Sequence, residues 1–446
     1  MNDLKTSFYN FLFETDGKYY IYNTLSIAVA ELDEDTYKCL KDGLIGNINP
    51  DYIEPLYEQK FLVDKDADEQ SEYLYFYNRL RFGSTAKLLS ITLVPSYGCN
   101  LACPYCLQGQ EKKSKAMSLS DVHRVLNFVE NRIIESREGN NVPITKINAK
   151  LYGGEPMLQK EAITVFCNGM SEIAKNYECE IKYFMTSNFT LLDDDIFDLI
   201  KKYQIITQVS IDGDRNAHNA RRVWKDGRGT YDTIINNLKR FKQEHLEDLI
   251  VIRLNIDNEN ISAAEQMMEE IHTYSTDVYF GFLENFNGYN DDFGDKFVNV
   301  ESVSKSQKIK SLNALMKKYG YIVPEEFGKL APCALNIENK FFIDCFMNVY
   351  TCELALNQPE LKVGVLDSDD NFAPNANFYK IMNHSPALFP ECMKCKLMPM
   401  CAGGCSAKAY IQSNAKDGDL NRSYCMCDEK GLLEYLKDYV KRLEEE

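Results

Sequence analysis

From Lys87 onward the sequence alternates apolar, strand-like runs with amphipathic helical segments, and this alternation restricts the chain to a small group of folds. The runs that predict strands are 87–94, 146–154, 181–188, 207–212, 249–256 and 278–283. Helices are expected near 118–136, 160–176, 193–203, 230–244, 259–273 and 304–319. Consecutive strands joined by helices pair in parallel through right-handed crossovers. Since six such units are fewer than the eight of a closed barrel, we expect an α/β fold built on a partial, TIM-like (β/α)6 barrel.

The segments on either side of this barrel differ from it in pattern. Residues 1–83 hold two strand-like runs around a turn at Asp16–Gly17–Lys18, followed by helical segments, and they predict a small, winged-helix-like β+α module. The charged stretch 64–72 is expected to be a loop or linker. The C-terminal part is rich in cysteine and loops and ends in an amphipathic helix. We therefore expect four units, at 1–83, 84–325, 326–430 and 431–446.

Charge and hydrophobicity exclude several kinds of partner. The chain of 446 residues has 50 Lys and Arg against 67 Asp and Glu, which gives a net charge of −17. This acidity disfavours nucleic acid and anionic membranes as partners. No apolar run is long enough to span a bilayer and the N-terminus lacks a secretion signal, so we expect a cytoplasmic protein. Fifteen cysteines in a reducing compartment favour metal binding over disulfide bonds.

Three cysteines follow the first expected barrel strand with the spacing Cys99-x3-Cys103-x2-Cys106. In parallel α/β folds the chemistry sits at the carboxyl ends of the strands, which is where this loop falls. Three thiolates bind three irons of a [4Fe–4S] cluster and leave the fourth iron open to another ligand. The alternatives are a chance grouping near a turn and a zinc ion completed by a remote ligand. The position at a strand end favours a catalytic iron–sulfur cluster.

Two more groups of cysteines lie in the C-terminal part of the chain. The looser group is Cys333, Cys345 and Cys352, and the tighter group is Cys392, Cys395, Cys401 and Cys405, followed by Cys425 and Cys427. Sulfur ligands at this spacing select zinc or iron–sulfur clusters. The glycine pair before Cys405 permits the backbone to wrap around such a group.

The stretch CNLACPYC (99–106) resembles the CxxxCxxC loop of the radical S-adenosylmethionine (SAM) enzymes, and the resemblance covers most of the chain. It implies that the amino and carboxylate groups of SAM chelate the open iron. It also implies that one electron from the cluster cleaves SAM to a 5′-deoxyadenosyl radical, which abstracts a hydrogen atom from the substrate. The fourth iron position is thus expected to bind the cosubstrate.

Later stretches resemble the SAM-binding motifs of that family. YGGEP (152–156) ends the second expected strand, and its two glycines let a backbone approach a ligand closely. MTSN (185–188) ends the third, and VSIDG (209–213) ends the fourth, with Ser210 and Asp212 on one face. Arg222 resembles the clamp on the SAM carboxylate, because a guanidinium binds a carboxylate bidentately, and Arg221 is its rival. The resemblance assigns SAM contacts to Tyr105, Gly153, Gly154, Glu155, Asn188, Ser210, Asp212, Arg222 and Leu283, with Glu155 at the amino group and Tyr105 and Leu283 at the adenine, and leaves His218 as a structural hydrogen-bonder.

The C-terminal cysteines resemble the SPASM extension of radical SAM enzymes, which carries two auxiliary [4Fe–4S] clusters. The resemblance implies an outer cluster held by Cys392, Cys395, Cys401 and one of Cys425 or Cys427. It implies an inner cluster held by Cys333, Cys352 and Cys405, which either keeps an open iron or is completed by Cys345. Two features depart from the family: Met347 replaces a glycine, and Asn339 stands where some members have a further cysteine. We expect three [4Fe–4S] clusters in all, with two zinc sites stiffening a lid as the alternative to the auxiliary pair.

The small module before this core resembles the leader-binding domain of ribosomal-peptide maturases, which adds a peptide strand to the edge of its sheet. A structural cap on the barrel is the alternative. We therefore expect a radical SAM–SPASM maturase of the sactipeptide or ranthipeptide type. Its expected partners are a precursor peptide with its leader and an electron donor such as flavodoxin or ferredoxin. The expected product is a cysteine thioether crosslink, with a carbon–carbon crosslink or an epimerised residue as variants.

Two other functions compete with this one. An anaerobic sulfatase-type maturase oxidises Cys or Ser to formylglycine, and Glu353, directly after Cys352, matches the position of its acidic base, with Glu in place of Asp. An iron–sulfur electron carrier or a zinc scaffold is the alternative without catalysis. The N-terminal module disfavours the sulfatase-type maturase, and the ordered SAM-site stretches disfavour a carrier.

Overall fold

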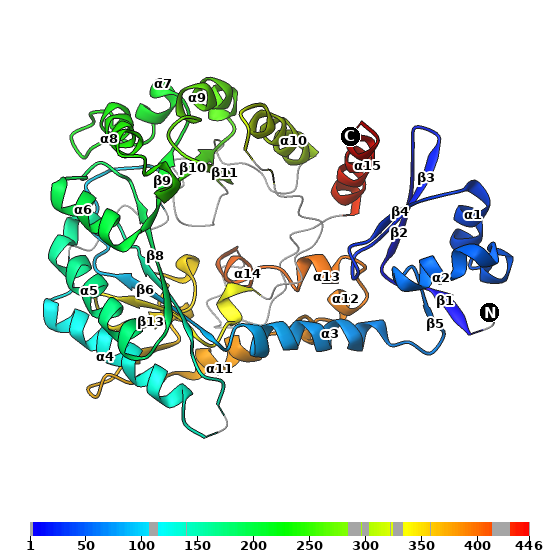
Figure 1. Cartoon of the computed structure of the whole chain (residues 1–446), viewed down its shortest axis with the longest axis horizontal. Helices are drawn as coiled ribbons and strands as arrows, with labels where there is room; N and C mark the ends of the chain where they lie inside the picture. Colours follow the sequence, from blue (N-terminus) through cyan, green and yellow to red (C-terminus); the bar gives the residue numbers. More distant parts are fainter. Residues whose placement is uncertain are drawn as a thin grey trace.

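The computed structural model describes residues 3–106, 115–139, 141–283, 296, 303–321, 323, 333–356, 358–412 and 429–445. Its centre is a ten-stranded mixed sheet (Figure 1). Six of its strands pair in parallel in chain order: β6 (Leu88–Val94), β7 (Lys146–Leu151), β8 (Glu180–Ser187), β9 (Ile206–Ile211), β10 (Ile250–Ile256) and β11 (Asp277–Phe282). The six expected strands are therefore present, and they differ from the expected ranges by a few residues at their ends.

Helices cover one face of this parallel sheet, on its outer side in Figure 1. They are α4 (Leu119–Ser136), α5 (Lys160–Asn176), α6 (Asp194–Tyr203), α7 (Arg215–Asn219), α8 (Tyr231–Gln243), α9 (Ala264–Ile271) and α10 (Val303–Lys318). Strand side chains alternate between the two faces, and in β7 Ile147, Ala149 and Leu151 are buried in the main core. Asn148 and Lys150 face the other way, so β7 places polar and charged side chains on the inner face of the sheet.

The sheet continues past β6 into the cysteine-rich part of the chain. β12 (Lys340–Asp344) pairs in parallel with β6, and β13 (Asn348–Tyr350), β14 (Gly364–Leu366) and β15 (Phe372–Pro374) follow antiparallel. Short helices α11 (Ala376–Asn383), α12 (Pro390–Met393), α13 (Met398–Cys401) and α14 (Ser406–Gln412) complete this part. Because Asp344 is paired with Val94, the end of β12 lies beside the end of the strand that leads to Cys99.

The N-terminal segment forms a separate β-plus-helix unit. β2 (Asn10–Thr15), β3 (Lys18–Asn23) and β4 (Val29–Leu32) make an antiparallel sheet, and β1 (Leu4–Thr6) pairs with β5 (Leu62–Asp64). Asp16 and Gly17 form the β2–β3 turn with φ of 53° and 75°, the left-handed conformation that both central residues of a type I′ turn need. Helices α1 (Glu34–Asp42) and α2 (Pro50–Glu58) complete the unit.

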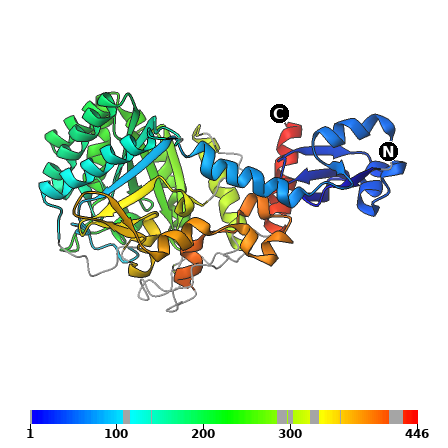
Figure 2. The same ribbon diagram turned by 90° about the horizontal axis from the view of Figure 1, so that it is seen from below.

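The prediction of a loop or linker over 64–72 is wrong for its second half, because helix α3 (Glu69–Arg79) begins there. The Asp68 carboxylate accepts a hydrogen bond from the Ser71 N–H at 3.0 Å and caps the helix. Acidic residues in the first turn also complement the helix dipole. Figures 1 and 2 show α3 as the element that runs from the N-terminal unit to the large sheet.

The N-terminal unit shares its core with the C-terminal part of the chain. Phe11 packs in one apolar cluster with Leu397 and with Leu436 of the terminal helix α15 (Glu429–Glu445). The Thr24 hydroxyl donates a hydrogen bond to the Lys396 carbonyl at 2.5 Å. This unit is thus anchored to the segment that carries the outer group of cysteines. No helix in the described part of the chain is both long and apolar enough to cross a lipid bilayer.

Candidate active site

The loop after β6 brings its cysteines together at the carboxyl end of the parallel sheet. It forms a small apolar cluster of Cys99, Leu101, Cys103 and Tyr105, with Cys106, Trp224 and Leu283 packed against it. Burial raises the pKa of Cys103 to about 11, and the nearby Arg222 guanidinium opposes this shift. The two residues expected at the adenine, Tyr105 and Leu283, therefore lie beside the cysteines.

Gly153 and Gly154 let the chain after β7 run directly against the backbone that leads into Cys99. A Cβ on Gly154 would lie 2.1 Å from the carbonyl oxygen of Gly98, and a Cβ on Gly153, whose φ is 137°, would lie 2.4 Å from that of Ser96. The Gly154 N–H donates to the Ser96 carbonyl at 3.1 Å. Since no side chain fits at either position, the glycine pair sets the place of the cysteine loop.

Glu155 and Asn188 join the ends of β7 and β8 to this loop. The fully buried Glu155 carboxylate accepts hydrogen bonds from the Ser187 hydroxyl at 2.9 Å and from the Asn188 N–H at 2.7 Å. Burial raises the pKa of Glu155, and these hydrogen bonds oppose the shift. The Asn188 side-chain amide donates to the side-chain oxygen Oδ1 of Asn100 at 2.8 Å and to the Cys99 sulfur at 3.7 Å. Glu155 thus braces the strand ends, and Asn188 reaches the first thiol.

A hydrogen-bonded network connects Tyr105 with the ends of β9 and β10. The Tyr105 hydroxyl donates to the Asp212 carboxylate and accepts a hydrogen bond from Arg222 at 2.9 Å. The Asn255 amide donates to the other Asp212 oxygen at 3.0 Å. Asp212 is fully buried, and burial raises its pKa. The Nε of Arg222 is buried without a hydrogen-bond partner among the described residues, so this guanidinium keeps donor capacity for a further group.

Arg221 and His218 have structural partners. Arg221, the rival of Arg222, donates from Nε and Nη2 to the two Asp257 carboxylate oxygens at 2.6 and 3.0 Å, a bidentate ion pair. The His218 Nε2 lies 2.9 Å from the Thr230 hydroxyl, and burial lowers the pKa of His218 well below its usual range. Arg221 is therefore committed away from the cysteines, and His218 is a neutral hydrogen-bonding group.

The structure adds residues that the sequence did not single out. Asn255 is the next-to-last residue of β10, and its side chain donates a hydrogen bond to Asp212. The two-residue alternation that groups Ser210 with Asp212 on β9 applies to Arg253 and Asn255 on β10 as well. Ser210 itself is buried on β9, beside β10. Trp224 packs on the cysteine loop from a segment far away in the chain, and no local pattern indicates that contact.

The cysteine loop has the features of a sulfur-bound cluster site. In a [4Fe–4S] cluster each thiolate binds a different iron. Three thiols in an apolar loop, with the orphaned Nε of Arg222 in the same site, fit a cluster with an anionic ligand beside it.

The three cysteines expected to hold the inner cluster, Cys333, Cys352 and Cys405, come together. Cys333 and Cys405 share a hydrogen bond, and this contact together with burial raises the pKa of Cys405. Cys352 lies close to both, and burial raises its pKa to about 12. Cys333 precedes β12, Cys352 follows β13 and Cys405 precedes α14, and all three pack against the main core. Their grouping fits a common sulfur-bound group.

Cys345, the fourth expected inner residue, has different neighbours. It is fully buried in the main core directly after β12. Burial raises its pKa to about 11, Asp344 adds to this shift, and Lys115 opposes it. It also lies close enough to Tyr97 to influence that hydroxyl. These contacts place Cys345 near the end of β6 and give no support to the expectation that it completes the inner set.

The outer cysteines lie where the N-terminal unit meets α12 and α13. The hydroxyls of Tyr9 and Tyr73 are buried without a hydrogen-bond partner among the described residues. Tyr9 lies near Cys395, and Tyr73 lies near Cys392 and Cys401. An orphaned buried donor is costly, so two of them beside three thiols fit a group rich in acceptor sulfur. The other expected outer ligands, Cys425 and Cys427, lie outside the described residues.

Glu353 lies among charged groups on the inner face of the sheet. Burial lowers the pKa of Lys150 in β7, and the Glu353 carboxylate opposes this shift. Burial raises the pKa of Tyr279 in β11, with Glu353 again contributing, and the Tyr279 hydroxyl donates to Gln208 at 2.6 Å. Glu353 is therefore within electrostatic reach of both Cys352 and the inner sheet face.

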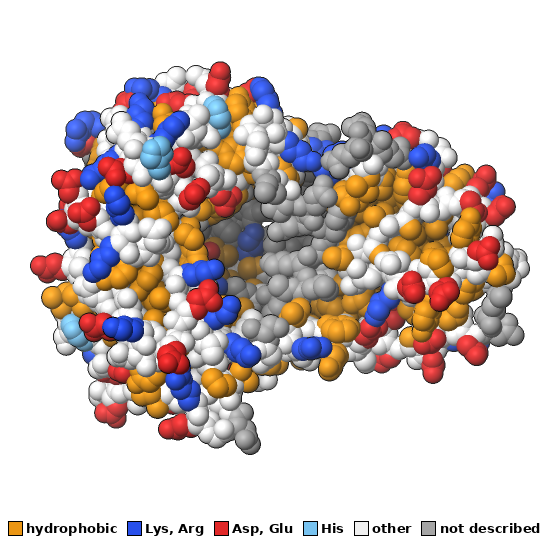
Figure 3. Space-filling model, in the orientation of Figure 1, with side chains coloured by type: hydrophobic (Ala, Val, Ile, Leu, Met, Phe, Trp, Pro, Cys, Tyr) orange, Lys and Arg blue, Asp and Glu red, His pale blue; other side chains and the backbone are white. Residues whose placement is uncertain are grey.

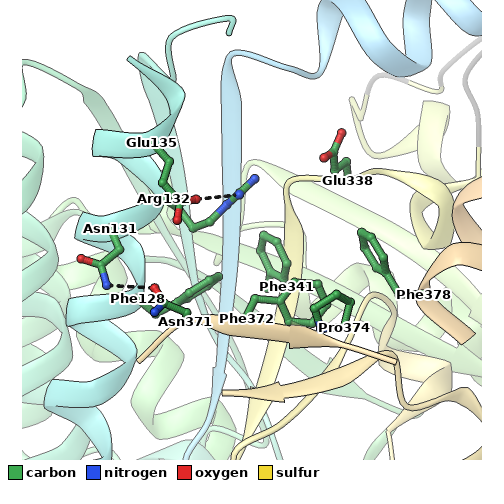
Figure 4. A pocket seen from close by; sticks show the side chains of 10 residues that line it. All are labelled: Phe128, Asn131, Arg132, Glu135, Glu338, Phe341, Asn371, Phe372, Pro374 and Phe378. Carbon is green, nitrogen blue, oxygen red and sulfur yellow. Dashed lines mark hydrogen bonds and ion pairs between the residues drawn. The ribbon is translucent and has the colours of Figure 1, made fainter. Parts of the chain in front are cut away.

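A separate cavity of about 220 Å³ lies at the other end of β6 and β12 (Figure 4). Its lining consists of aromatic and polar side chains from α4, α11, β12, β15 and the adjoining loops: Phe128, Asn131, Arg132, Glu135, Glu338, Phe341, Asn371, Phe372, Pro374 and Phe378. Phe341 is paired with Ile91 in the first half of β6, away from the cysteine loop. None of the expected site residues lines this cavity.

The chain matches a known family over its central part. Residues 93–271 match the model of the radical SAM superfamily. This range begins at the end of β6 and ends with α9, so it contains the cysteine loop, the glycine pair and Arg222.

Two relatives extend this similarity. The cysteine-type anaerobic sulfatase-maturating enzyme of Clostridium perfringens (strain 13 / Type A) is 23% identical over 373 residues, which are 78% of this chain and 96% of the relative. The radical SAM cyclopropyl synthase TigE of Paramaledivibacter caminithermalis is 22% identical over 274 residues, which are 54% of this chain and 55% of TigE.

Solved structures of distant sequence share the fold. Native anSMEcpe with bound AdoMet and Cp18Cys peptide superposes with a TM-score of 0.61 at 16% identity and covers 80% of this chain and 98% of its own. Streptococcus suis SuiB bound to precursor peptide SuiA superposes with a TM-score of 0.55 at 15% identity and covers 95% of this chain and 100% of its own. At these identities the likeness shows a common α/β fold with a large mixed sheet.

Proposed function

We propose that this chain, whose residues 93–271 form a radical SAM domain, is a radical SAM enzyme that crosslinks a ribosomally made precursor peptide. The proposed crosslink is a thioether between a cysteine sulfur and a carbon of another residue. The observation that carries this proposal is the meeting of the cysteine loop, the glycine pair and Arg222 at one end of the sheet. The peptide is suggested by the relatives, since two solved structures of the same fold hold the Cp18Cys and SuiA peptides.

Radical SAM enzymes use SAM and a [4Fe–4S] cluster, which supply a 5′-deoxyadenosyl radical when both are bound. In this chain Cys99, Cys103 and Cys106 would hold the cluster. Arg222 is our candidate for the SAM carboxylate, because its Nε is buried without a partner among the described residues while Arg221 is engaged by Asp257. An apolar wall for the adenine would come from Leu283, beside the cysteines.

The contacts of the other expected SAM residues suggest more exact roles. The Glu155 carboxylate is occupied by Ser187 and by the Asn188 N–H, so we propose that it positions the strand ends. The backbone carbonyls of the adjacent glycines would then face the SAM amino group. Asp212 holds the Tyr105 hydroxyl and thereby fixes the cysteine loop against β9. Ser210, on the same strand face as Asp212, is proposed to share the SAM carboxylate with the arginine.

Iron content is expected to distinguish three clusters from one cluster with two zinc ions. The anaerobically reconstituted protein should approach about twelve irons per chain, four for each of three cubes. The measurement is metal analysis together with acid-labile sulfide. About four irons per chain with stoichiometric zinc would contradict the auxiliary clusters and favour two structural zinc sites.

Mass spectrometry of a short precursor peptide, which we expect to be encoded beside this chain, tests the proposed reaction. With enzyme, SAM and reductant, a crosslink removes two hydrogen atoms from the peptide, and fragmentation locates the joined residues. A flavodoxin or ferredoxin is the proposed natural source of electrons. Failure to form any 5′-deoxyadenosine would contradict an enzyme and would favour an electron carrier or a scaffold.

Formylglycine formation on a sulfatase peptide is the second candidate, and Glu353 is the observation that favours it. Glu353 follows Cys352 directly and interacts with Lys150 on the inner sheet face, where it could accept the proton of a substrate thiol or hydroxyl. The similarity to the Clostridium perfringens sulfatase-maturating enzyme supports the same reaction. Its product differs from a crosslink, because sulfur is replaced by oxygen while two hydrogens are lost.

Glu353→Gln is expected to slow product formation about a hundredfold if a side-chain base is used, since general base catalysis contributes about 10²–10⁴-fold. The amide keeps the size of the side chain but cannot accept the proton. The measurement is the ratio of modified peptide to 5′-deoxyadenosine, which falls when radical formation outruns productive chemistry. Product formation at the wild-type rate would exclude a base at this position and leave metal coordination to favour the thiolate.

The proposed leader-binding site is the open edge of β4 in the N-terminal unit. Among the described strands, β4 pairs only with β3. The Asn23 N–H donates to the Ala28 carbonyl at 3.0 Å. Hydrogen-bonded pairs alternate with non-hydrogen-bonded pairs along an antiparallel ladder, so Ala30 and Leu32 also bond to β3. The N–H groups of Val29 and Glu31 then face outward and are available to an added peptide strand.

Glu31→Pro is expected to weaken binding of the full-length precursor about tenfold, because it removes one outward donor without breaking a bond to β3. Glu31→Ala is the matched control, since it also removes the exposed ion pair with Lys18 but keeps the N–H. Binding is measured by fluorescence anisotropy with a labelled precursor. Equal weakening by both variants would assign the effect to the side chain, and no effect of proline would favour a structural cap.

A further inference from the structure

Two cations lie on the inner face of the sheet, opposite the helices. In β7, Lys150 alternates with the buried Ala149 and Leu151, and in β10 Arg253 alternates with the buried Ile252. Side chains that alternate with the core residues of a strand face away from the core. Figure 3 shows a hollow in the middle of the molecule with Lys or Arg side chains inside it. The two cations are thus on the inner face of the sheet, away from the core that the helices cover.

Arg253 is held in place, and it forms no ion pair with a carboxylate of the described residues. It is in register with Tyr279 on β11, and its guanidinium carbon lies 6.0 Å from the centre of that ring. It also runs across Gly281, where a Cβ would lie 2.6 Å from the Arg253 Nε. The same Nε is buried without a hydrogen-bond partner among the described residues. A buried donor of this kind is costly until a ligand accepts from it.

The charges around Lys150 do not balance. Burial lowers the pKa of Lys150, the cations Lys340 and Arg253 lower it further, and the Glu353 carboxylate and the Cys352 thiol oppose this shift. Among the described residues, three cations therefore lie near one carboxylate and one thiol. Excess charge in a partly buried region is unfavourable unless an opposite charge is bound. Since the whole chain carries −17, this local positive excess does not follow from its composition.

The position of these cations separates them from the proposed SAM site. Arg253 precedes Asn255 by two residues on β10, and Asn255 contacts Asp212 in the network beside the cysteine loop. Two residues of a strand span about 7 Å, so Arg253 lies one layer deeper in the sheet than that network. Both cations are instead close to Glu353. The Glu353 carboxylate influences the pKa of Lys150 and also the pKa of Tyr279, the neighbour of Arg253.

We propose that Lys150 and Arg253 bind the side-chain carboxylate of an Asp or Glu residue in the peptide segment that is modified. The inference rests on the proposed peptide maturase function. A guanidinium with a free Nε–H offers directed hydrogen bonds to a carboxylate, and an ammonium adds a second charge. Because Glu353 adjoins the same place, the acidic residue of the substrate lies within a few positions of the modified one.

The test uses a library of short peptides with a central cysteine, random flanking residues, an acetylated N-terminus and an amidated C-terminus. Reconstituted enzyme with SAM is immobilised under anaerobic conditions, and captured peptides are sequenced by mass spectrometry. Wild-type enzyme should enrich Asp or Glu over Asn or Gln about tenfold at one or more flanking positions. The double variant Lys150→Gln, Arg253→Gln should lose this enrichment. Lys146→Gln, on the same face of β7 and paired with Glu180 near the surface, is the matched control and should keep it.

Several outcomes would overturn the proposal. They are equal capture of acidic and neutral peptides by the wild type, no capture of either, or unchanged acid preference in the double variant. A second library with free C-termini separates the sources of carboxylate, since enrichment that appears only there would assign the site to a chain terminus. If the double variant loses its iron, the acid preference of Gly281→Ala is measured in its place, because the added Cβ displaces Arg253 without removing a charge. Wild-type enzyme that forms no 5′-deoxyadenosine would refute the proposed function itself, whereas radical formation without acid preference refutes only this inference.

Discussion

Replacing Cys99, Cys103 and Cys106 together with alanine is expected to abolish formation of 5′-deoxyadenosine under anaerobic reduction. A cluster with one open iron is held by three thiolates, so the triple change removes every protein bond to it. The proposed auxiliary clusters have separate cysteines, and iron should therefore fall from about twelve to about eight per chain. The measurement is chromatography of the SAM cleavage products together with metal analysis.

Cys167→Ala is the control for the loss of a buried thiol. Cys167 is fully buried in α5, in the main core and outside the cysteine loop. Its replacement should leave SAM cleavage and iron content unchanged, at a cost in stability of about 1 kcal/mol. Radical formation that persists in the triple variant would contradict the central claim, and loss of all iron in that variant would mean that the auxiliary clusters depend on the first.

The parallel part of the sheet could be predicted because each strand carries its own pattern. The runs that became β6 to β11 are apolar, have the length of buried strands and are separated by amphipathic segments, so local sequence alone indicates their type and order. The cysteine loop and the glycine pair could be assigned to the same edge for a related reason. Parallel strands end at one edge of a sheet, and both stretches directly follow a strand.

The rest depends on contacts between distant segments. β12 joins the sheet next to β6 although its residue Lys340 lies 250 positions after its partner Ser90. The run 340–344 is short and has no flanking helix pattern of its own, so the local sequence does not indicate this pairing. The choice between Arg221 and Arg222 rests on Asp257, which comes from the loop after another strand and takes Arg221 into an ion pair. The charged stretch 64–72 predicts a loop although its second half is the first turn of α3, because charged residues favour both a solvated loop and a capped helix start.

Among glycine-to-alanine changes at the proposed SAM site, Gly154→Ala is expected to reduce SAM cleavage most. The new Cβ would lie 2.1 Å from the carbonyl oxygen of Gly98, a backbone atom that no rotamer change can move aside. The end of β7 and the start of the cysteine loop must therefore separate, which costs about 1–3 kcal/mol or more. It also breaks the hydrogen bond from the Gly154 N–H to Ser96 that sets the loop.

The expected result is a protein that still folds, melts several degrees lower and forms little 5′-deoxyadenosine, because Cys99 no longer meets the other two thiols. Gly46→Ala is the matched control: a Cβ there meets nothing within 4 Å, so its effect on the free energy of unfolding should stay within about 0.5 kcal/mol. Iron content separates two causes of lost activity, since a displaced loop loses about four irons per chain while a blocked SAM site keeps them. If Gly154→Ala retained both its iron and its SAM cleavage, the glycine pair would not position the cysteine loop, and the resemblance of YGGEP to a SAM-binding motif would be left without its structural basis.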